Sequence, residues 1–164
     1  MKPEAIVYTS NTGFTRRYAD MLAKKTGLPV YDIAAAKEVY GKPVIYMGWL
    51  MASTVKDYAK AAKKFDVRAV CGVGLCPTGA LLNEVRKAAK IPDKTALFTV
   101  QGGMDHSKLK GLYKFMINML VKVLSGKQNK SQGESAMLKM IIDGGDFVNE
   151  KNLSDVYRWF KAQR

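Results

Sequence analysis

Short apolar runs alternate with longer segments of helical periodicity over the first two-thirds of the chain, and this alternation constrains the fold more than any other feature. Five runs have the length and residue types of strands: 5–9, 29–33, 44–48, 67–73 and 95–100. They are continuously apolar, as strands buried on both faces of a parallel sheet are. Alternation of strand and helix at this spacing predicts βαβ units with right-handed crossovers. We therefore expect an α/β fold, with helices on both faces of a parallel sheet.

The segments between these runs predict the covering helices. Apolar residues recur at helical spacing in 15–25, 55–65, 80–90, 135–142 and 153–161. Gly27 is a good stop for the first helix, and the pair Gly144–Gly145 is expected to separate the last two. The polar stretch 125–133 predicts an exposed loop. A length of 164 residues, 48% of them hydrophobic, predicts one domain spanning residues 1–164.

The loop between the first strand and the first helix has the composition of an anion site. It consists of Ser10, Asn11, Thr12, Gly13, Phe14 and Thr15. Backbone N–H groups at a helix N-terminus attract anions, hydroxyl groups add donors, and glycine permits close approach of a ligand to the backbone. The loop has neither the spacing of a dinucleotide fingerprint nor that of a nucleotide-hydrolysing phosphate loop. A ligand-free helix cap is the alternative interpretation.

Residues 6–15 resemble the FMN-phosphate fingerprint of flavodoxins, [ST]-x-T-G-x-T after the first strand. Within that superfamily, residues 101–109, followed by a Met-rich basic helix, are similar to the menaquinone-dependent protoporphyrinogen IX dehydrogenase branch. The resemblance implies a flavodoxin-like, doubly wound five-stranded parallel sheet of order 2-1-3-4-5. It also implies non-covalently bound FMN and, after strand 5, an insertion of about residues 105–133 that contains a basic amphipathic helix.

Two further loops would hold the flavin ring if the resemblance is carried over by position. The loop after the third strand contains Gly48, Trp49, Leu50, Met51 and Ala52. Trp49 is the candidate for stacking on the ring, although a core tryptophan is the alternative.

The loop after the fifth strand contains Gln101, Gly102, Gly103, Met104 and Asp105. Its adjacent glycines are expected to offer free N–H donors to the pyrimidine edge. Flavodoxins often carry a second aromatic residue in this loop, which this chain lacks. One face of the ring is therefore left open to a substrate or a quinone, unless Met104 covers it. His106, the single histidine, is an acid–base candidate or an exposed loop residue.

Cys71 and Cys76 do not have the C-x-x-C spacing of a redox motif, so we expect buried, unreactive thiols. No metal site is expected. The chain shows neither a signal peptide nor an uninterrupted apolar stretch long enough to span a membrane, which predicts a cytoplasmic location.

The segment 108–124 predicts a helix of unusual character. Lys110, Lys114, Asn118 and Lys122 recur every four residues, and most other positions are large and apolar. The six lysines between His106 and Gly133 are accompanied by no acidic residue. Such a helix suits an anionic membrane interface, on the inner face of the cell membrane, or a site for an amphiphilic acidic substrate. The alternative is a helix that covers the sheet edge and forms a homodimer contact.

The net charge of +13 bears on the choice of function. Positive charge near a flavin stabilises its anionic reduced form, which favours an oxidoreductase that oxidises a protoporphyrinogen-like substrate with a quinone as acceptor. A flavodoxin-type electron carrier with a redox-protein partner is the alternative. Nucleic-acid binding rests on charge alone, and we do not expect it.

Overall fold

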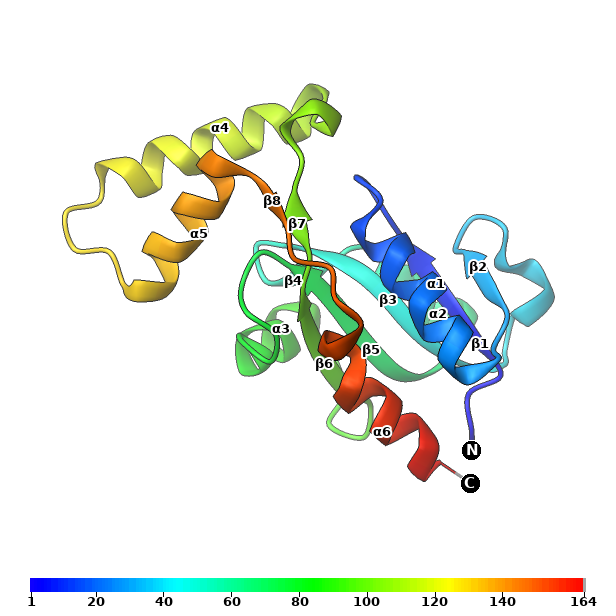
Figure 1. The fold of residues 1–164 in the computed structure, drawn as a ribbon. Coiled ribbons are helices and arrows are strands. Elements are labelled where there is room, and N and C mark those ends of the chain that lie inside the picture. The colour runs from blue at the N-terminus through cyan, green and yellow to red at the C-terminus, as the bar shows by residue number, and fades with distance from the viewer. Residues whose placement is uncertain (164) are drawn as a thin grey trace.

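The computed structural model describes residues 1–163 and contains a central, mostly parallel sheet (Figure 1). Five parallel strands follow the spatial order β2-β1-β3-β5-β6. Their bounds are β1 Ala5–Thr9, β2 Val30–Asp32, β3 Pro43–Met51, β5 Asp66–Gly74 and β6 Ala96–Gln101. The α/β class and the order of these five strands are as predicted.

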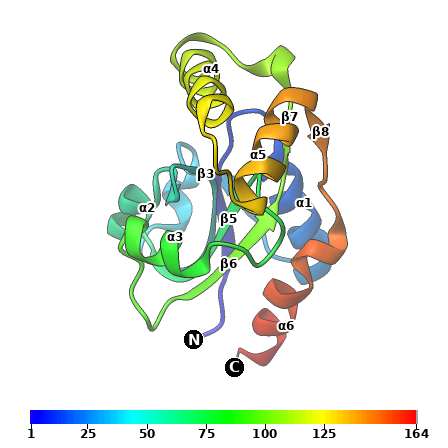
Figure 2. The same ribbon diagram turned by 90° about the vertical axis from the view of Figure 1, so that its left-hand side faces the viewer.

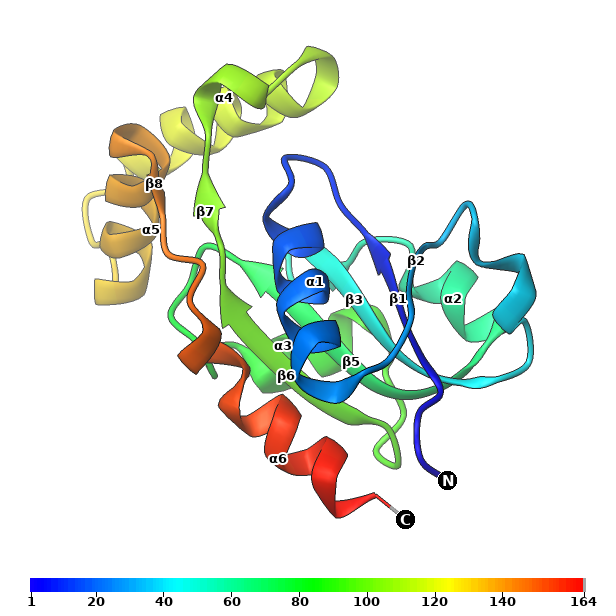
Figure 3. The same cartoon turned by 45° about the vertical axis from the view of Figure 1, so that its right-hand side comes forward.

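Helices cover both faces of the sheet because successive side chains of each strand point to opposite sides. On one face, α1 (Phe14–Thr26) and α6 (Ser154–Ala162) contribute to the core that buries Ile6 and Tyr8 (Figure 3). On the other face, α2 (Tyr58–Lys64) and α3 (Leu82–Ala89) contribute to the core that buries Ala5 and Val7. A short 3₁₀ helix, η1 (Ala36–Val39), adds Ala36 and Val39 to this second core. The continuously apolar strands are thus explained by burial on both sides.

The predicted helix 55–65 begins later than expected. Beyond the sheet, β3 continues into a tight hairpin with β4 (Thr54–Val55), in which Leu50 pairs with Val55. The turn places Ala52 and Ser53 at positive φ, and α2 starts only at Tyr58. The apolar pattern missed the hairpin because a two-residue strand has too few residues to show a period.

After β6 the chain leaves the sheet and forms a helical arm, which we define as residues 103–146. The arm consists of β7 (Gly103–Met104), η2 (His106–Lys108), α4 (Gly111–Gly126), α5 (Gln132–Asp143) and β8 (Gly145–Asp146). Strands β7 and β8 pair antiparallel at its base, and α4 packs against α5. Figure 1 shows the arm projecting beyond the sheet.

The arm corrects two sequence expectations. The insertion is longer than 105–133, because the segment expected to help close the domain, 135–142, belongs instead to α5 and packs on α4. The expected loop 125–133 shrinks to a few residues, since a capping box between Ser131 and Glu134 starts α5 early. Only α6, which follows η3 (Glu150–Leu153), closes the domain as predicted. Within residues 1–163, no helix is long and apolar enough to cross a membrane.

Candidate functional site

A cavity of about 570 Å³ lies at the carboxyl ends of the parallel strands, between the sheet and the arm. Its lining comes from the loops after β1, β3, β5 and β6 and from one side of α4. Figure 2 shows α4 above the loop that joins β1 to α1. Ligands of open parallel sheets bind at this edge, and ligand pockets commonly enclose about 300–1,000 Å³. Position and size therefore both mark this cavity as the candidate site.

The predicted anion loop forms one end of the cavity. Asn11, Thr12, Phe14 and Thr15 line it, and Thr15 is only 2% exposed. Within the described chain, the backbone N–H groups of residues 12–15 donate no hydrogen bond to another protein group. The next amide, that of Arg16, approaches Ser10 Oγ at 3.4 Å. The helix start thus presents four unengaged N–H donors, the arrangement that binds anions.

The hairpin after β3 forms a second wall. Trp49, Leu50, Met51 and Ala52 all line the cavity. Gly48 does not; a Cβ on it would lie 2.7 Å from Val55 Cγ1, so this glycine is needed for the hairpin to pack. The structure therefore brings four of the five predicted residues of this loop to the site.

Tyr113 is a functional candidate that the sequence analysis missed. It extends from α4 and packs edge-to-face on Trp49, with ring centroids 5.2 Å apart and planes at 79°. A second aromatic residue is therefore present, although it comes from the arm and not from the loop after the fifth strand. No local pattern could have shown this, because the contact depends on where α4 docks.

The glycine pair after β6 plays a different part from the one expected. The N–H of Gly102 donates to Gly74 O at 2.7 Å, so it is not free for a ligand. A Cβ on Gly103 would lie 2.3 Å from Gly145 O and 2.8 Å from the Phe14 ring. Both glycines border the cavity, but their main effect is to let the base of the arm cross close to α1 and to β5. Met104 also lines the cavity.

The remaining predicted residues of this loop do not reach the cavity. The Gln101 backbone accepts from the Tyr18 hydroxyl and donates to Thr78 Oγ1, which fixes the end of β6. Asp105 caps η2; its hydrogen bonds to Ser107, together with Lys108, lower the pKa of this carboxyl. His106 is exposed and lies outside the cavity lining, so its position gives no support to an acid–base role.

The two cysteines differ in their surroundings. Cys71 is fully buried in β5, and burial raises the pKa of its thiol to about 12, as expected for an unreactive group. Cys76 lies beyond the strand, is half-buried and lines the cavity, which was not expected. In the part of the chain that the structure describes, no group of three or more His, Cys, Asp or Glu side chains is placed to hold a metal ion.

The rest of the cavity is mainly apolar. The inner side of α4 contributes Tyr113, Ile117 and Leu120, and α5 contributes Met137. A group of backbone N–H donors and hydroxyls thus lies at one end, while most of the remaining lining is aromatic or aliphatic. This arrangement suits a ligand with an anionic end and a flat apolar body.

Comparison of the chain with protein-family models, with curated proteins and with solved structures finds no match.

Proposed function

We propose that the chain has a flavodoxin-like fold and binds FMN as a redox flavoprotein. One observation carries the proposal: an apolar cavity adjoins four unengaged backbone N–H groups at the start of α1. Open parallel sheets bind ligands at the switch point of the strand order, and in flavodoxin, whose sheet has the order found here, FMN binds between the first and third strands. The loops after β1 and β3 flank that point and both line the cavity.

The residues present fit this cofactor at its phosphate and at its ring system. The N–H groups of residues 12–15 and the hydroxyls of Thr12 and Thr15 would hold the phosphate. Trp49 would pack against the ring system. When bound, FMN would supply the electron and hydride transfer, for which the protein provides position, electrostatics and access.

We further propose that the protein is an enzyme that oxidises a reduced, protoporphyrinogen-like substrate and passes the electrons to a quinone. An electron carrier needs only an exposed cofactor edge, whereas α4 encloses additional apolar space beyond the loops. The net charge of +13 supports the same choice, because it favours the anionic reduced cofactor. Its sign would also attract an acidic substrate.

The cofactor proposal is tested on purified protein. We expect a yellow protein with a flavin absorption spectrum, or stoichiometric binding when FMN is added and followed by calorimetry. Riboflavin, which lacks the phosphate, should bind at least tenfold more weakly, since about 1.5–3 kcal/mol is associated with each hydrogen bond to a charged group. A colourless protein that takes up no FMN would overturn the proposal.

The choice between enzyme and carrier is tested by steady-state turnover of protoporphyrinogen with menaquinone. Ile117→Glu places an unpaired charge on the cavity side of α4 and should lower kcat/KM roughly tenfold or more, with FMN still bound. The matched control is Asn118→Glu, which adds the same charge at the exposed neighbouring position. If neither quinone nor porphyrinogen supports turnover while a reductase reduces the bound flavin quickly, the protein is a carrier.

A further inference from the structure

The side chains of α4 fall into three sectors around the helix axis, and the sectors differ in chemistry. Positions advance by about 100° per residue, which separates the sector centres by about 120°. The sector toward the cavity and α5 contains Tyr113, Ile117, Leu120, Val121 and Leu124. A second sector is apolar and exposed: Leu112, Phe115, Met116, Met119 and Val123. The third is polar: Lys110, Lys114, Asn118 and Lys122.

The exposed apolar sector is too large to be incidental. Leu112, Phe115, Met119 and Val123 are 69%, 62%, 56% and 63% exposed. Single exposed apolar residues are ordinary on soluble proteins, but a contiguous stripe along a helix marks a surface that contacts a partner. The structure also excludes one alternative left open by the sequence, since this side of α4 does not cover the edge of the sheet.

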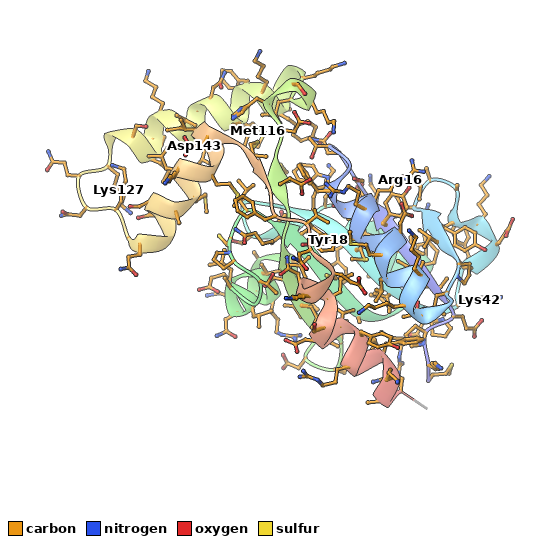
Figure 4. All side chains as sticks on the ribbon, in the orientation of Figure 1. Arg16, Tyr18, Lys42, Met116, Lys127 and Asp143 are labelled. Carbon is orange, nitrogen blue, oxygen red and sulfur yellow. The ribbon has the colours of Figure 1, made fainter. Side chains whose placement is uncertain are left out.

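The lysines beside the stripe define the partner's charge. Lys110, Lys114 and Lys122 take part in no ion pair within residues 1–163, whereas Lys127 at the end of the arm pairs with Glu134. No acidic residue lies in the segment 107–132. Figure 4 shows that Lys127, and with it the tip of the arm, lies far from Tyr18 in the body. The partner is therefore an anionic surface with an apolar layer beside it.

We propose that the outer side of α4 docks on an anionic lipid bilayer. The exposed apolar sector enters the boundary between headgroups and acyl chains, and the three lysines contact the headgroups. A second copy of this chain fits less well, because an antiparallel twofold contact through the same stripe would bring two lysine rows together with no acidic residue of the segment 107–132 to neutralise them.

In the docked orientation, the cavity lies next to the lipid-facing side of α4. Met116, Met119 and Val123 belong to the exposed sector and also line the cavity. The cavity therefore adjoins the lipid-facing side of α4, so an apolar molecule dissolved in the bilayer would reach it without crossing water. The docking itself needs no cofactor and goes beyond the proposed function.

The test is sedimentation with vesicles of phosphatidylcholine alone and of phosphatidylcholine mixed with phosphatidylglycerol. We expect binding to the mixed vesicles only. The triple variant Lys110→Gln, Lys114→Gln, Lys122→Gln should bind about a hundredfold more weakly, at about fivefold per lysine. The matched control is Lys63→Gln, Lys87→Gln, Lys94→Gln, which removes the same charge from exposed positions outside the arm and should bind as the wild type does.

The apolar contribution is tested by Leu112→Ser with Phe115→Ser. Neither residue lines the cavity, so FMN binding should be unchanged while vesicle binding falls at least tenfold. Equal binding to both kinds of vesicle, or binding that survives both sets of changes, would overturn the proposal. So would a concentration-dependent dimer in ultracentrifugation that Phe115→Ser dissolves. FMN titration of the same variants separates failure of docking from failure of the proposed function.

Discussion

The hydroxyl of Thr15 lies beside the unengaged amides of the β1–α1 loop, in a position that is almost fully buried. We expect Thr15→Ala to weaken FMN binding by about 1–2 kcal/mol, roughly tenfold, because one hydrogen bond to a charged phosphate is lost. Thr26→Ala is the matched control, since its hydroxyl donates to Leu22 O at the other end of α1. Calorimetric titration of both variants measures the effect, and equal affinities would show that Thr15 does not contact the phosphate.

The hairpin turn beside the cavity holds Ala52 at a φ of 46°, a left-handed conformation that disfavours side chains with a Cβ. Ala52→Gly should stabilise the ligand-free protein by about 1 kcal/mol and raise Tm by about 2–4 °C. Ala34→Gly, an exposed position whose φ is not left-handed, serves as control and should lower Tm slightly. Thermal unfolding followed by circular dichroism distinguishes the two.

At the scale of elements, hydrogen bonds of the Tyr18 hydroxyl hold the segment that follows the arm against α1. Its hydroxyl donates to Gln101 O and accepts from Asn152 Nδ2 at 2.7 Å, within a side chain that is otherwise fully buried. Tyr18→Phe should lower the free energy of unfolding, measured in urea, by about 1–3 kcal/mol. The reason is that Asn152 Nδ2 loses the Tyr18 hydroxyl as its hydrogen-bond acceptor. Tyr31→Phe, whose exposed hydroxyl lies 3.5 Å from Glu38, should have little effect.

The arm is also fastened by the pairing of Arg17 in α1 with Asp146 in β8. Partial burial raises the pKa of Asp146, but the hydrogen bonds from Arg17 and from the Val148 amide outweigh it and hold the pKa below its ordinary value. The stabilising pair is therefore complete above about pH 4 and is lost as the pH falls through the lowered pKa.

We accordingly expect hydrogen exchange at 103–104 and 145–146 to quicken below about pH 4, after correction for the intrinsic rate. Asp146→Asn should produce the faster exchange already at neutral pH. Asp155→Asn, which removes an exposed pair with Arg158 on α6, should leave these amides unchanged. If the exchange rates of the β7–β8 amides did not change with pH after this correction, the Arg17–Asp146 pair would not be what holds the base of the arm.

At the scale of the whole molecule, stability should decline in alkaline solution. Burial raises the pKa of the Cys71 thiol from 9.0 to about 12, and it raises the pKa values of Tyr18 and Tyr46 as well. The folded state disfavours the charged forms of these three groups. Their contribution to the free energy of unfolding is therefore complete below pH 9, and it is lost as the pH rises through their pKa values in the folded state. We expect Tm to fall between about pH 9 and 12. Cys71→Val should make the fall less steep, since it removes one titrating group from the core.

The positions that the sequence predicted well are those where local chemistry decides the structure. Ile6 and Val7 are apolar on both sides of β1 because helices bury both faces, and Gly27 ends α1 in a left-handed conformation. The unengaged backbone donors of the loop between β1 and α1 were predictable, because their direction follows from the strand–helix junction; that they bind an anion stays a prediction. The Trp49–Tyr113 contact could not be predicted, since it joins two elements far apart in the chain.

The sequence by itself determined the α/β class, the five parallel strands and the loop composition at the head of α1, because hydrophobic period and turn chemistry act over a few neighbouring residues. Only the tertiary structure decided that α4 and α5 form an arm over the cavity, with one side of α4 inward and another exposed. An apolar arc of a helix specifies that a surface is to be buried, but not against which partner. The position of α4 is set by the pairing of β7 with β8 and by the close approach of Gly103 to Gly145, which join residues far apart in the chain.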